Sequence, residues 1–350
     1  MNEAIELNQG KQFMPETVLL TGGAGFIGSH ICVELARAGK KPVVFDNFCN
    51  SKASVFDRLS KIIGVPIEFV EGDIRDSELL RRVIHDFGIS SVIHLAGLKA
   101  VGESVSTPLA YYDNNVVGTL RLLEAMRDTN VCSLVFSSSA TVYGDPIKLP
   151  IDESHPLSAT NPYGRTKLII EGMLRDLHRS DDRWHICLLR YFNPVGAHAS
   201  GLIGEDPNGI PNNLMPYVLK VAVGEFKELS VWGSDYDTID GTGVRDYIHV
   251  VDLAEGHVRA MEQLQSMKCE AINLGTGCGS SVLEVVKTFE RVNGVRVPYV
   301  VKERRPGDVP ACYAQASLAR TLLGWNAKHN LDDMCRDAWK WQKVSSHQKI

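Results

Sequence analysis

The chain has 350 residues, of which 44% are hydrophobic and 23% charged, and its net charge is −5 at pH 7. This composition excludes a disordered or fibrous protein, and the acidic balance excludes a broadly basic nucleic-acid-binding surface. Every apolar stretch is interrupted well short of the ~18 residues that a membrane-spanning helix needs. We therefore expect a globular protein of about two domains that binds neither nucleic acid nor a membrane.

The cysteines and the N-terminal residues indicate the cellular compartment in which we expect the protein. The eight cysteines are scattered without a C-x-x-C pair or a metal-like spacing. This pattern is typical of reduced thiols in a cytoplasmic protein and indicates no metal site. Residues 1–16 include Glu3, Glu6 and Lys11, so we expect a polar N-terminal tail and not a signal peptide.

A glycine-rich stretch follows the first predicted strand, Val18–Leu20. It reads Thr21-Gly-Gly-Ala-Gly-Phe-Ile-Gly28 and leads into an amphipathic helix from Ile27 to Ala38. Glycines at a strand-to-helix turn let backbone N–H groups approach a pyrophosphate, and the helix N-terminus adds a partial positive charge. The pattern predicts a dinucleotide site, with a purely structural turn as the alternative.

The second apolar run ends in an acidic residue, Asp46, about 20 residues after the glycines. A carboxylate at that point accepts hydrogen bonds from the adenosine ribose and repels a 2′-phosphate, which favours NAD over NADP. The third apolar run leads to Asp73. We expect the Asp73 carboxylate either to meet an adenine amino group or to cap the next helix. Asp76 is the other candidate for that N-cap.

The fourth run, 91–95, ends in Ala96 and Gly97, small residues that let a cofactor pass close to the backbone, and Lys99 then reaches the pyrophosphate. A helical stretch is predicted from Pro108 to Asp128, although Asn114, Asn115 and Gly118 are poor helix-interior residues. Their presence indicates either tight packing or a ligand contact by Asn114.

Hydroxyl groups gather at the end of the fifth run, 133–136, in Ser137-Ser-Ser-Ala-Thr141. Asn161-Pro162 then predicts a helix start, and Tyr163 and Lys167 lie four residues apart on one face of that helix. A sixth run follows at 186–191. Alternating strands and helices predict a Rossmann-type, doubly wound parallel α/β sheet.

The regular alternation of strands and helices ends after residue 192. A glycine- and proline-rich loop follows, and then strands and helices in no regular order. We therefore expect an NAD-binding domain over 17–192, joined again by later segments such as 247–275, and a smaller mixed α/β domain over 193–350 that binds the substrate.

The pair of Tyr163 and Lys167 beside a dinucleotide site indicates proton transfer coupled to hydride transfer at an alcohol carbon. The phenol's pKa of about 10 must fall to near neutrality, yet burial raises it. Two cations supply the opposite effect: Lys167 and the oxidised nicotinamide ring. Ser139 then hydrogen-bonds the reacting oxygen.

Longer motifs carry a resemblance over nearly the whole chain, from Thr17 to about Gln342. The most specific are Leu189-Arg-Tyr-Phe-Asn-Pro-Val-Gly-Ala197, Gly209-Ile-Pro-Asn-Asn-Leu-Met-Pro-Tyr217 and Asp240-Gly-Thr-Gly-Val-Arg-Asp-Tyr-Ile-His249. The chain resembles the UDP-galactose 4-epimerases of the extended short-chain dehydrogenase/reductase family. The resemblance implies a homodimer that keeps NAD bound, oxidises the sugar at C4, lets the bound 4-ketose turn over and returns the hydride to its other face.

By this resemblance, Tyr163 is the base, Lys167 its electrostatic partner and Ser139 the group that binds the sugar O4. The residues expected at the cofactor are Gly22, Gly25, Phe26, Ile27, Gly28, Asp46, Asn47, Asn50, Ser51, Asp73, Ile74, Leu95, Ala96, Gly97, Lys99, Asn114, Ser139, Tyr163, Lys167 and Phe192. Those expected at the UDP-sugar are Lys99, Ser139, Thr141, Tyr163, Asn193, Asn213, Leu214, Ser230, Trp232, Arg245, Tyr247, Arg305, Asp308 and Cys312.

Several alternatives stay open. Arg245 and Arg305 form surface ion pairs, for instance with Asp246 or Asp308, if they bind no diphosphate. Cys312 replaces a tyrosine of some family members, and the smaller side chain predicts that UDP-N-acetylhexosamines are accepted too. The competing functions are epimerisation of a UDP-pentose or UDP-uronate, a sugar-nucleotide 4,6-dehydratase, and a non-catalytic NAD sensor.

Overall fold

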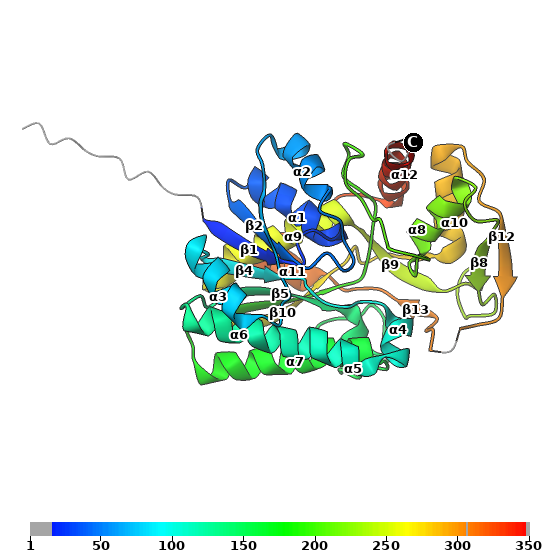
Figure 1. Ribbon diagram of the computed structural model, residues 1–350. Coiled ribbons are helices and arrows are strands. Elements are labelled where there is room, and N and C mark those ends of the chain that lie inside the picture. Colours follow the sequence, from blue (N-terminus) through cyan, green and yellow to red (C-terminus); the bar gives the residue numbers. More distant parts are fainter. Residues whose placement is uncertain (1–15, 306, 348–350) are drawn as a thin grey trace, which may run out of the picture.

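The computed structural model describes residues 16–305 and 307–347, and its centre is a seven-stranded parallel sheet (Figure 1). The predicted polar tail lies outside the described residues, apart from Glu16. The sheet order places β1 and β4 side by side at the point where the winding reverses. The predicted doubly wound α/β fold is confirmed. In spatial order the strands are β3 (Glu68–Glu71), β2 (Lys41–Asp46), β1 (Thr17–Thr21), β4 (Ser91–His94), β5 (Ser133–Ser139), β6 (His185–Tyr191) and β10 (Cys269–Leu274).

Two hydrophobic clusters cover the two faces of this sheet. Successive residues of a strand point to opposite faces, and accordingly Leu20 belongs to one cluster and Leu19 to the other. The first cluster includes side chains from α1 (Phe26–Arg37), α2 (Val55–Ile63), α9 (Val250–Gln263) and α11 (Ser317–Leu323). The second includes side chains from α3 (Ser77–Asp86), α6 (Gly118–Asp128) and α7 (Pro162–Ser180). Burial of both faces explains why the central strands β1 and β4 are apolar runs without alternation, whereas the edge strand β3 is largely exposed.

The region predicted as one helix from 108 to 128 is interrupted. It consists of α5 (Pro108–Tyr111), a wide π-helical turn η1 (Tyr112–Val117) and α6, and α4 (Val101–Ser106) precedes it. A Cβ atom at Gly118 would collide with the Ile74 side chain, so glycine there permits close packing. Tight packing therefore accounts for the glycine that is unfavourable in a helix.

The second half of the chain builds two smaller sheets. The first joins β7 (Asn193–Val195), β9 (Val244–His249), β11 (Gly279–Ser281) and β13 (Ala311–Cys312), and the second pairs β8 (Leu229–Trp232) with β12 (Tyr299–Lys302). A third hydrophobic cluster fills the space between these sheets and three helices. The helices are α8 (Leu214–Ala222), α10 (Val282–Asn293) and α12 (Leu331–His347), and the short helical turns η2 (Ala140–Tyr143) and η3 (Leu264–Ser266) complete the elements.

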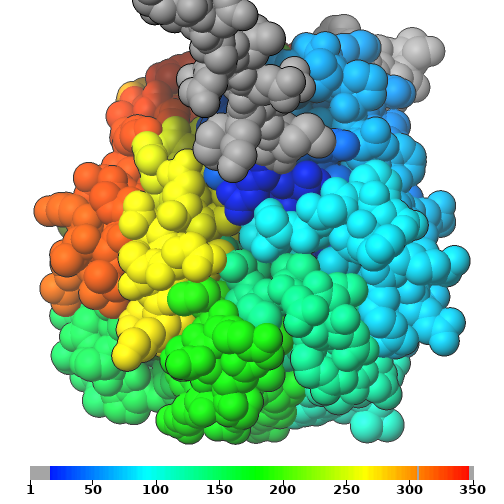
Figure 2. All heavy atoms as spheres, turned by 90° about the vertical axis from the view of Figure 1, so that its left-hand side faces the viewer, coloured from blue at the N-terminus to red at the C-terminus, as the bar shows by residue number. Residues whose placement is uncertain are grey.

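Residues 250–274 pack against the first half of the chain. Strand β10 pairs with β6 in parallel register, and α9 packs beside α1. Figure 2 shows this yellow segment next to the blue N-terminal part. The proposed domain boundary near residue 192 stays a prediction. Over 16–305 and 307–347, no helix is long and apolar enough to cross a membrane.

Candidate active site

The glycine-rich loop sits at the switch point between β1 and β4. Gly22 has a φ of +73°, and a Cβ there would lie 2.7 Å from the backbone nitrogen of Ala96, so the loops after the two strands meet at this point. A Cβ at Gly28 would lie 2.5 Å from Gly23 Cα, which leaves room only for glycine. Crevices outside the carboxyl ends of strands at a switch point are where nucleotides bind in such sheets.

The helix that follows this loop presents donors to that crevice. Gly25 is the N-cap of α1 and has no side chain to cap the first-turn N–H groups. A Cβ at Gly25 would have one neighbour within 4 Å among the described atoms, Gly22 O at 3.3 Å. Unpaired N–H groups at a helix N-terminus suit a phosphate. The loop therefore fits a dinucleotide's pyrophosphate.

Asp46 organises the neighbouring turn. One carboxylate oxygen accepts a hydrogen bond from the N–H of Ala24 (3.0 Å), and the other accepts from Phe48 N–H and Ser51 Oγ (both 2.9 Å). The oxygen bonded by Ala24 can accept one more hydrogen bond, whereas the other oxygen already accepts two. The side chain is thus held beside the glycine loop in the position expected for a ribose contact.

Other predicted cofactor residues have identifiable partners. Asp76, and not Asp73, caps α3, by accepting from the Leu79 N–H (2.9 Å). Asp73 pairs with Arg75, whose hydrogen bonds hold the Asp73 pKa at about 2. Its carboxylate is therefore an acceptor at neutral pH, and the capping alternative falls to Asp76.

The amide that crosses to the loop after β4 is Asn115, the neighbour of the predicted Asn114. Asn115 is buried; its oxygen accepts from Leu98 N–H (2.8 Å), and its nitrogen donates to Leu98 O (3.0 Å). Asn114 donates to Asn115 Oδ1 (3.0 Å). The sequence marks Asn115 as unfavourable in a helix interior but gives no reason to choose it over Asn114 for the contact across to this loop.

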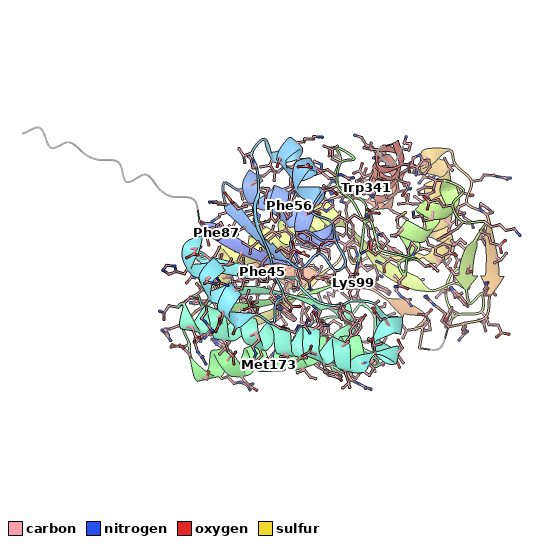
Figure 3. The ribbon with its side chains drawn as sticks, viewed as in Figure 1. Phe45, Phe56, Phe87, Lys99, Met173 and Trp341 are labelled. Atoms are coloured by element: carbon pink, nitrogen blue, oxygen red, sulfur yellow. The ribbon has the colours of Figure 1, made fainter. Side chains whose placement is uncertain are left out.

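The remaining predicted cofactor residues differ in burial. Ile74 and Phe192 are buried, and Lys99 is exposed, with its Nζ 3.4 Å from Glu205 Oε1. In Figure 3, the labelled Lys99 lies between the two halves of the molecule. Half-buried members are Gly25, Phe26, Ile27, Leu95, Ala96 and Gly97, and exposed ones are Asn47 and Asn50.

The three successive serines at the end of β5 have different partners. Ser137 Oγ contacts His257 Nε2 (2.8 Å), and Ser138 Oγ donates to Glu171 Oε1 (2.7 Å), both in the interior. Ser139 Oγ, by contrast, accepts hydrogen bonds from the N–H and the hydroxyl of Thr141 (3.2 and 3.0 Å). Of the three serines, Ser139 is thus the one whose hydroxyl lies at the strand's end.

Helix α7 brings Tyr163 and Lys167 to these serines. Asn161 caps the helix by accepting from Gly164 N–H (2.9 Å), and Pro162 occupies its first position, as predicted. Burial raises the pKa of Tyr163, while a hydrogen bond with Ser139 lowers it. Without a cofactor, therefore, the phenol stays protonated at neutral pH.

Lys167 is buried and extends to the strand. Its Nζ donates to Ser137 O (2.7 Å) and lies 4.8 Å from the centre of the Phe136 ring. Burial lowers the Lys167 pKa to about 8, and the negative charge of Glu171 opposes this effect. The amine therefore remains largely a cation at pH 7, as a partner for a developing phenolate requires.

Sequence reasoning missed a buried network under helix α7. Glu171 is fully buried and accepts hydrogen bonds from Ser138 and Arg190, and Arg190 also donates to Tyr143 Oη (3.1 Å). Tyr143 in turn donates to Asn273 Oδ1 (2.6 Å). The available signal was an acidic residue four positions after Lys167, on the same helix face. The network ties α7 to β5, β6 and β10.

Two predicted UDP-sugar residues meet where β7 pairs with β9. Asn193 lies opposite Tyr247 in parallel register. Tyr247 is buried, which raises its pKa to about 12, so its hydroxyl is a hydrogen-bond donor at neutral pH. The pairing thus brings residues more than fifty positions apart to one place.

Both predicted diphosphate arginines contact Asp308. Arg305 Nε lies 2.9 Å from its carboxylate, and an Arg245 guanidinium nitrogen lies 3.7 Å from it. The ion-pair alternative is therefore observed for Asp308 and not for Asp246, whose buried carboxylate accepts from residues 276, 277 and 314. The half-exposed Trp232 lies 5.9 Å from the Arg305 guanidinium. Of the other predicted contacts, Ser230 lies on β8, Leu214 begins α8 and Asn213 is its N-cap.

Cys312 connects the two groups of residues. It lies opposite Arg245 in the pairing of β13 with β9. It also packs against a small cluster that contains Val142 and Phe192, as does the half-buried Ala140 next to Ser139. The cysteine therefore belongs both to the strand pairing of Arg245 and to the cluster beside the end of β5.

Comparison with known proteins agrees with this arrangement. Residues 19–338 match the family described as GDP-mannose 4,6 dehydratase. The chain is 59% identical over 326 residues to the UDP-glucose 4-epimerase of Bacillus subtilis (strain 168), covering 93% of this chain and 96% of that protein. It is 56% identical over 338 residues to the human UDP-glucose 4-epimerase, covering 94% and 97%.

Solved structures show the same likeness. The UDP-glucose 4-epimerase of Stenotrophomonas maltophila with bound NAD and formylated UDP-arabinopyranose superimposes with a TM-score of 0.94 at 52% identity, covering 95% of this chain and 99% of that one. The Bifidobacterium longum enzyme in complex with NAD+ and UDP gives a TM-score of 0.91 at 55% identity, with coverage of 94% and 99%. The chain belongs to the UDP-glucose 4-epimerases, within the extended short-chain dehydrogenase/reductase family.

Proposed function

We infer that Tyr163, Ser139 and Lys167 carry out the reaction of this family, the reversible NAD-dependent interconversion of UDP-galactose and UDP-glucose. The observation that supports these roles is the meeting of the three side chains at the carboxyl end of β5, beside a glycine loop that fits a pyrophosphate. Bound NAD supplies the hydride acceptor for C4 and later the hydride donor to the opposite face of the sugar.

The chain's own residues move the proton. Tyr163 takes the proton of the sugar O4 hydroxyl as the C4–H bond breaks, and returns it when that bond re-forms. Ser139 holds the O4 atom within reach. The ammonium group of Lys167 favours the phenolate electrostatically and counteracts the effect of burial.

The second half anchors the UDP while the sugar turns over. Arg245 and Arg305 share Asp308 as a partner in the absence of ligand. Guanidinium groups donate in pairs to phosphate oxygens, so we propose that both turn toward the diphosphate. Trp232 offers an aromatic surface to the uracil. The remaining UDP contacts proposed from the sequence are Lys99, Thr141, Asn193, Asn213, Leu214, Ser230, Tyr247 and Cys312.

The pocket also favours larger sugars. Cys312 pairs with Arg245 across β13 and β9 and packs against the same cluster as Ala140, and its side chain leaves more space than a tyrosine would. We therefore propose that UDP-N-acetylglucosamine and UDP-N-acetylgalactosamine are interconverted as well. A relative from Campylobacter jejuni, 34% identical with a TM-score of 0.82, is described as a UDP-Glc/GlcNAc 4-epimerase. Pentose or uronate derivatives of UDP remain the alternative substrates.

A dehydratase is disfavoured by the residues after Ser139. Elimination needs an acid beside the strand-end hydroxyl, and the turn η2 that follows consists of Ala140, Thr141, Val142 and Tyr143. A non-catalytic NAD sensor is disfavoured because Ser139, Tyr163 and Lys167 are all present and close together.

Product formation without added cofactor tests the proposal. The purified protein is incubated with UDP-galactose in NAD-free buffer, and UDP-glucose is measured. We expect turnover by the unmodified protein and a rate about 10²–10⁴ lower for Tyr163→Phe. Tyr217→Phe, on α8, is the matched control and should retain the rate. Equal rates for Tyr163→Phe and the unmodified protein would refute the assigned mechanism.

We also propose a homodimer that forms through α4, α5, α6 and α7, which lie along one side of the molecule (Figure 1). Apolar side chains are exposed there, among them Leu109 (82%), Val105 (64%) and Ile169 (42%). Leu109→Glu should convert the dimer to a monomer in gel filtration. Ile239→Glu, a substitution at another exposed isoleucine, should not. All eight cysteines are free, which supports a reducing, cytoplasmic location.

A further inference from the structure

The loop of residues 198–213 runs between the two halves of the molecule, where its green trace passes between α2 and α12 (Figure 1). It leaves the end of β7 and returns at Asn213, the N-cap of α8. An antiparallel bridge between Ala197 and Gly204 closes its first part. Apart from Asn213, which is a proposed UDP contact at its end, the loop has no role in the function assigned above.

One side of the loop is fixed to helix α12. A Cβ at Gly204 would lie 2.5 Å from the Trp341 ring, and Trp341 Nε1 donates to Glu205 O (3.2 Å). Lys340 Nζ donates to Ala199 O (2.5 Å). The labelled Trp341 lies beside this part of the chain in Figure 3. The loop therefore has a firm base on the substrate-binding side.

The other side of the loop contacts the dinucleotide-binding side at several separate points. Asp206 forms an ion pair with Lys52 (2.6 Å), and Asn208 Nδ2 donates to Cys49 O (3.2 Å). Glu205 Oε1 lies 3.4 Å from Lys99 Nζ. Cys49 and Lys52 flank the residues Asn50 and Ser51, and Ser51 hydrogen-bonds Asp46. These contacts extend from the neighbourhood of Asp46, the proposed ribose contact, to Lys99, the proposed pyrophosphate contact.

We propose that residues 198–213 form a clasp that retains NAD through turnover. The proposal rests on the cofactor position inferred above. The clasp joins the turn after β2 to the substrate-binding side, so that this turn moves away from the ribose only when the contacts of Asp206 and Asn208 break. A cofactor that gives back each hydride needs no exchange between cycles, and the clasp slows its loss.

The test measures exchange of bound NAD, not activity. Protein loaded with radiolabelled NAD is mixed with excess unlabelled NAD, and the retained label is followed over time. Because the Lys52–Asp206 pair is half exposed, its loss should accelerate exchange about two- to fivefold. Asp206→Lys and Lys52→Glu should each do so, and the charge-swapped double variant should return to within about twofold of the unmodified rate.

Controls separate the clasp from general effects of charge and folding. Lys61→Glu, on α2, reverses a nearby charge for which the described part of the chain shows no ion pair, and should leave exchange unchanged. Asp206→Asn removes the charge without reversing it, and it serves in place of Asp206→Lys if the reversed charge prevents folding. It should also accelerate exchange. Unchanged exchange in both single variants, with epimerase activity intact, would overturn the clasp alone. Absence of bound NAD from the unmodified protein would overturn both the cofactor site and the clasp.

Discussion

Lys167 donates a 2.7 Å hydrogen bond to the backbone carbonyl of Ser137, two residues before Ser139. This contact places a buried amine at the strand end where the proposed chemistry occurs. The position has an energetic cost because burial disfavours the ammonium form. The fold therefore holds Lys167 in a position that disfavours its charged form, and the free-energy cost can be measured.

The first prediction concerns stability against pH. Lys167 has a pKa of about 8 in the folded chain, below its ordinary value of 10.5. Between these two pH values the unfolded chain binds more protons, so the unfolding free energy should rise with pH. In cofactor-free protein, we expect the unmodified chain to gain about 3 kcal/mol relative to Lys167→Met across this window. Urea unfolding at a series of pH values measures the difference.

A matched substitution tests whether burial is the cause. Lys61 is exposed on α2, and Lys61→Met should leave the pH dependence of the unfolding free energy as it is in the unmodified chain. A Lys167→Met protein with the same pH dependence as the unmodified chain would show that the buried amine is not responsible.

The second prediction concerns the phenol of Tyr163. Burial raises its pKa, and the proposed counterweights are Lys167 and the positive charge of the oxidised nicotinamide ring. Reduction of bound NAD removes the ring charge and leaves the cofactor in place. We therefore expect a higher Tyr163 pKa with reduced than with oxidised cofactor, by at least about one pH unit. Phenolate absorbance near 295 nm, with Tyr163→Phe subtracted, gives this pKa. Identical Tyr163 titration curves with oxidised and reduced cofactor would show that the charge of the nicotinamide ring does not affect the phenol.

The third prediction concerns Glu171. Burial raises its pKa, but hydrogen bonds and charge from Arg190 outweigh that effect and hold the pKa below its usual value. Glu171→Gln leaves the buried Arg190 without a counter-charge, which should lower the unfolding free energy by about 3–5 kcal/mol. The control is Glu124→Gln, which breaks a partly exposed pair with Arg121 and should cost less than about 1 kcal/mol. Similar losses for both variants would contradict a special role of burial.

Local patterns in the sequence were sufficient for the fold class. The central strands β1 and β4 are short apolar runs, and Asn161-Pro162 marked the start of α7 at the residue where the structure has it. The interruption of the 108–128 helix was not predictable in the same way. It depends on the packing of Gly118 against Ile74, two residues brought together only by the fold.

The sequence suggests candidate site residues where one element supplies them, and suggests fewer where distant segments meet. The glycine loop and the pair of Tyr163 and Lys167 each lie within a few residues. The partners of Asp308 and the role of Asn115 depend on contacts across strands and helices, which spacing along the chain does not encode. Glu171 was not recognised because a single buried acid on a helix has the same sequence pattern as an exposed one.

The fourth prediction concerns substrate size. Cys312 packs against the cluster that contains Val142 and Phe192, and it is the register partner of Arg245 in the pairing of β13 with β9. A tyrosine there would extend into the space that we assign to the sugar's C2 substituent. Cys312→Tyr should therefore lower kcat/KM for UDP-N-acetylgalactosamine about 100-fold or more, and that for UDP-galactose less than about fivefold, since rejection by bulk acts on the larger substrate.

A smaller replacement separates bulk from thiol chemistry. Burial raises the Cys312 pKa to about 11, so the side chain is a neutral thiol at pH 7 and its ionisation contributes nothing to selectivity. Cys312→Ser should then retain both activities. The two rates are measured with each UDP-sugar under identical conditions, by separation of the product nucleotides. Equal losses for both sugars in Cys312→Tyr would show that residue 312 supports the fold of β13 and does not set the size of the pocket.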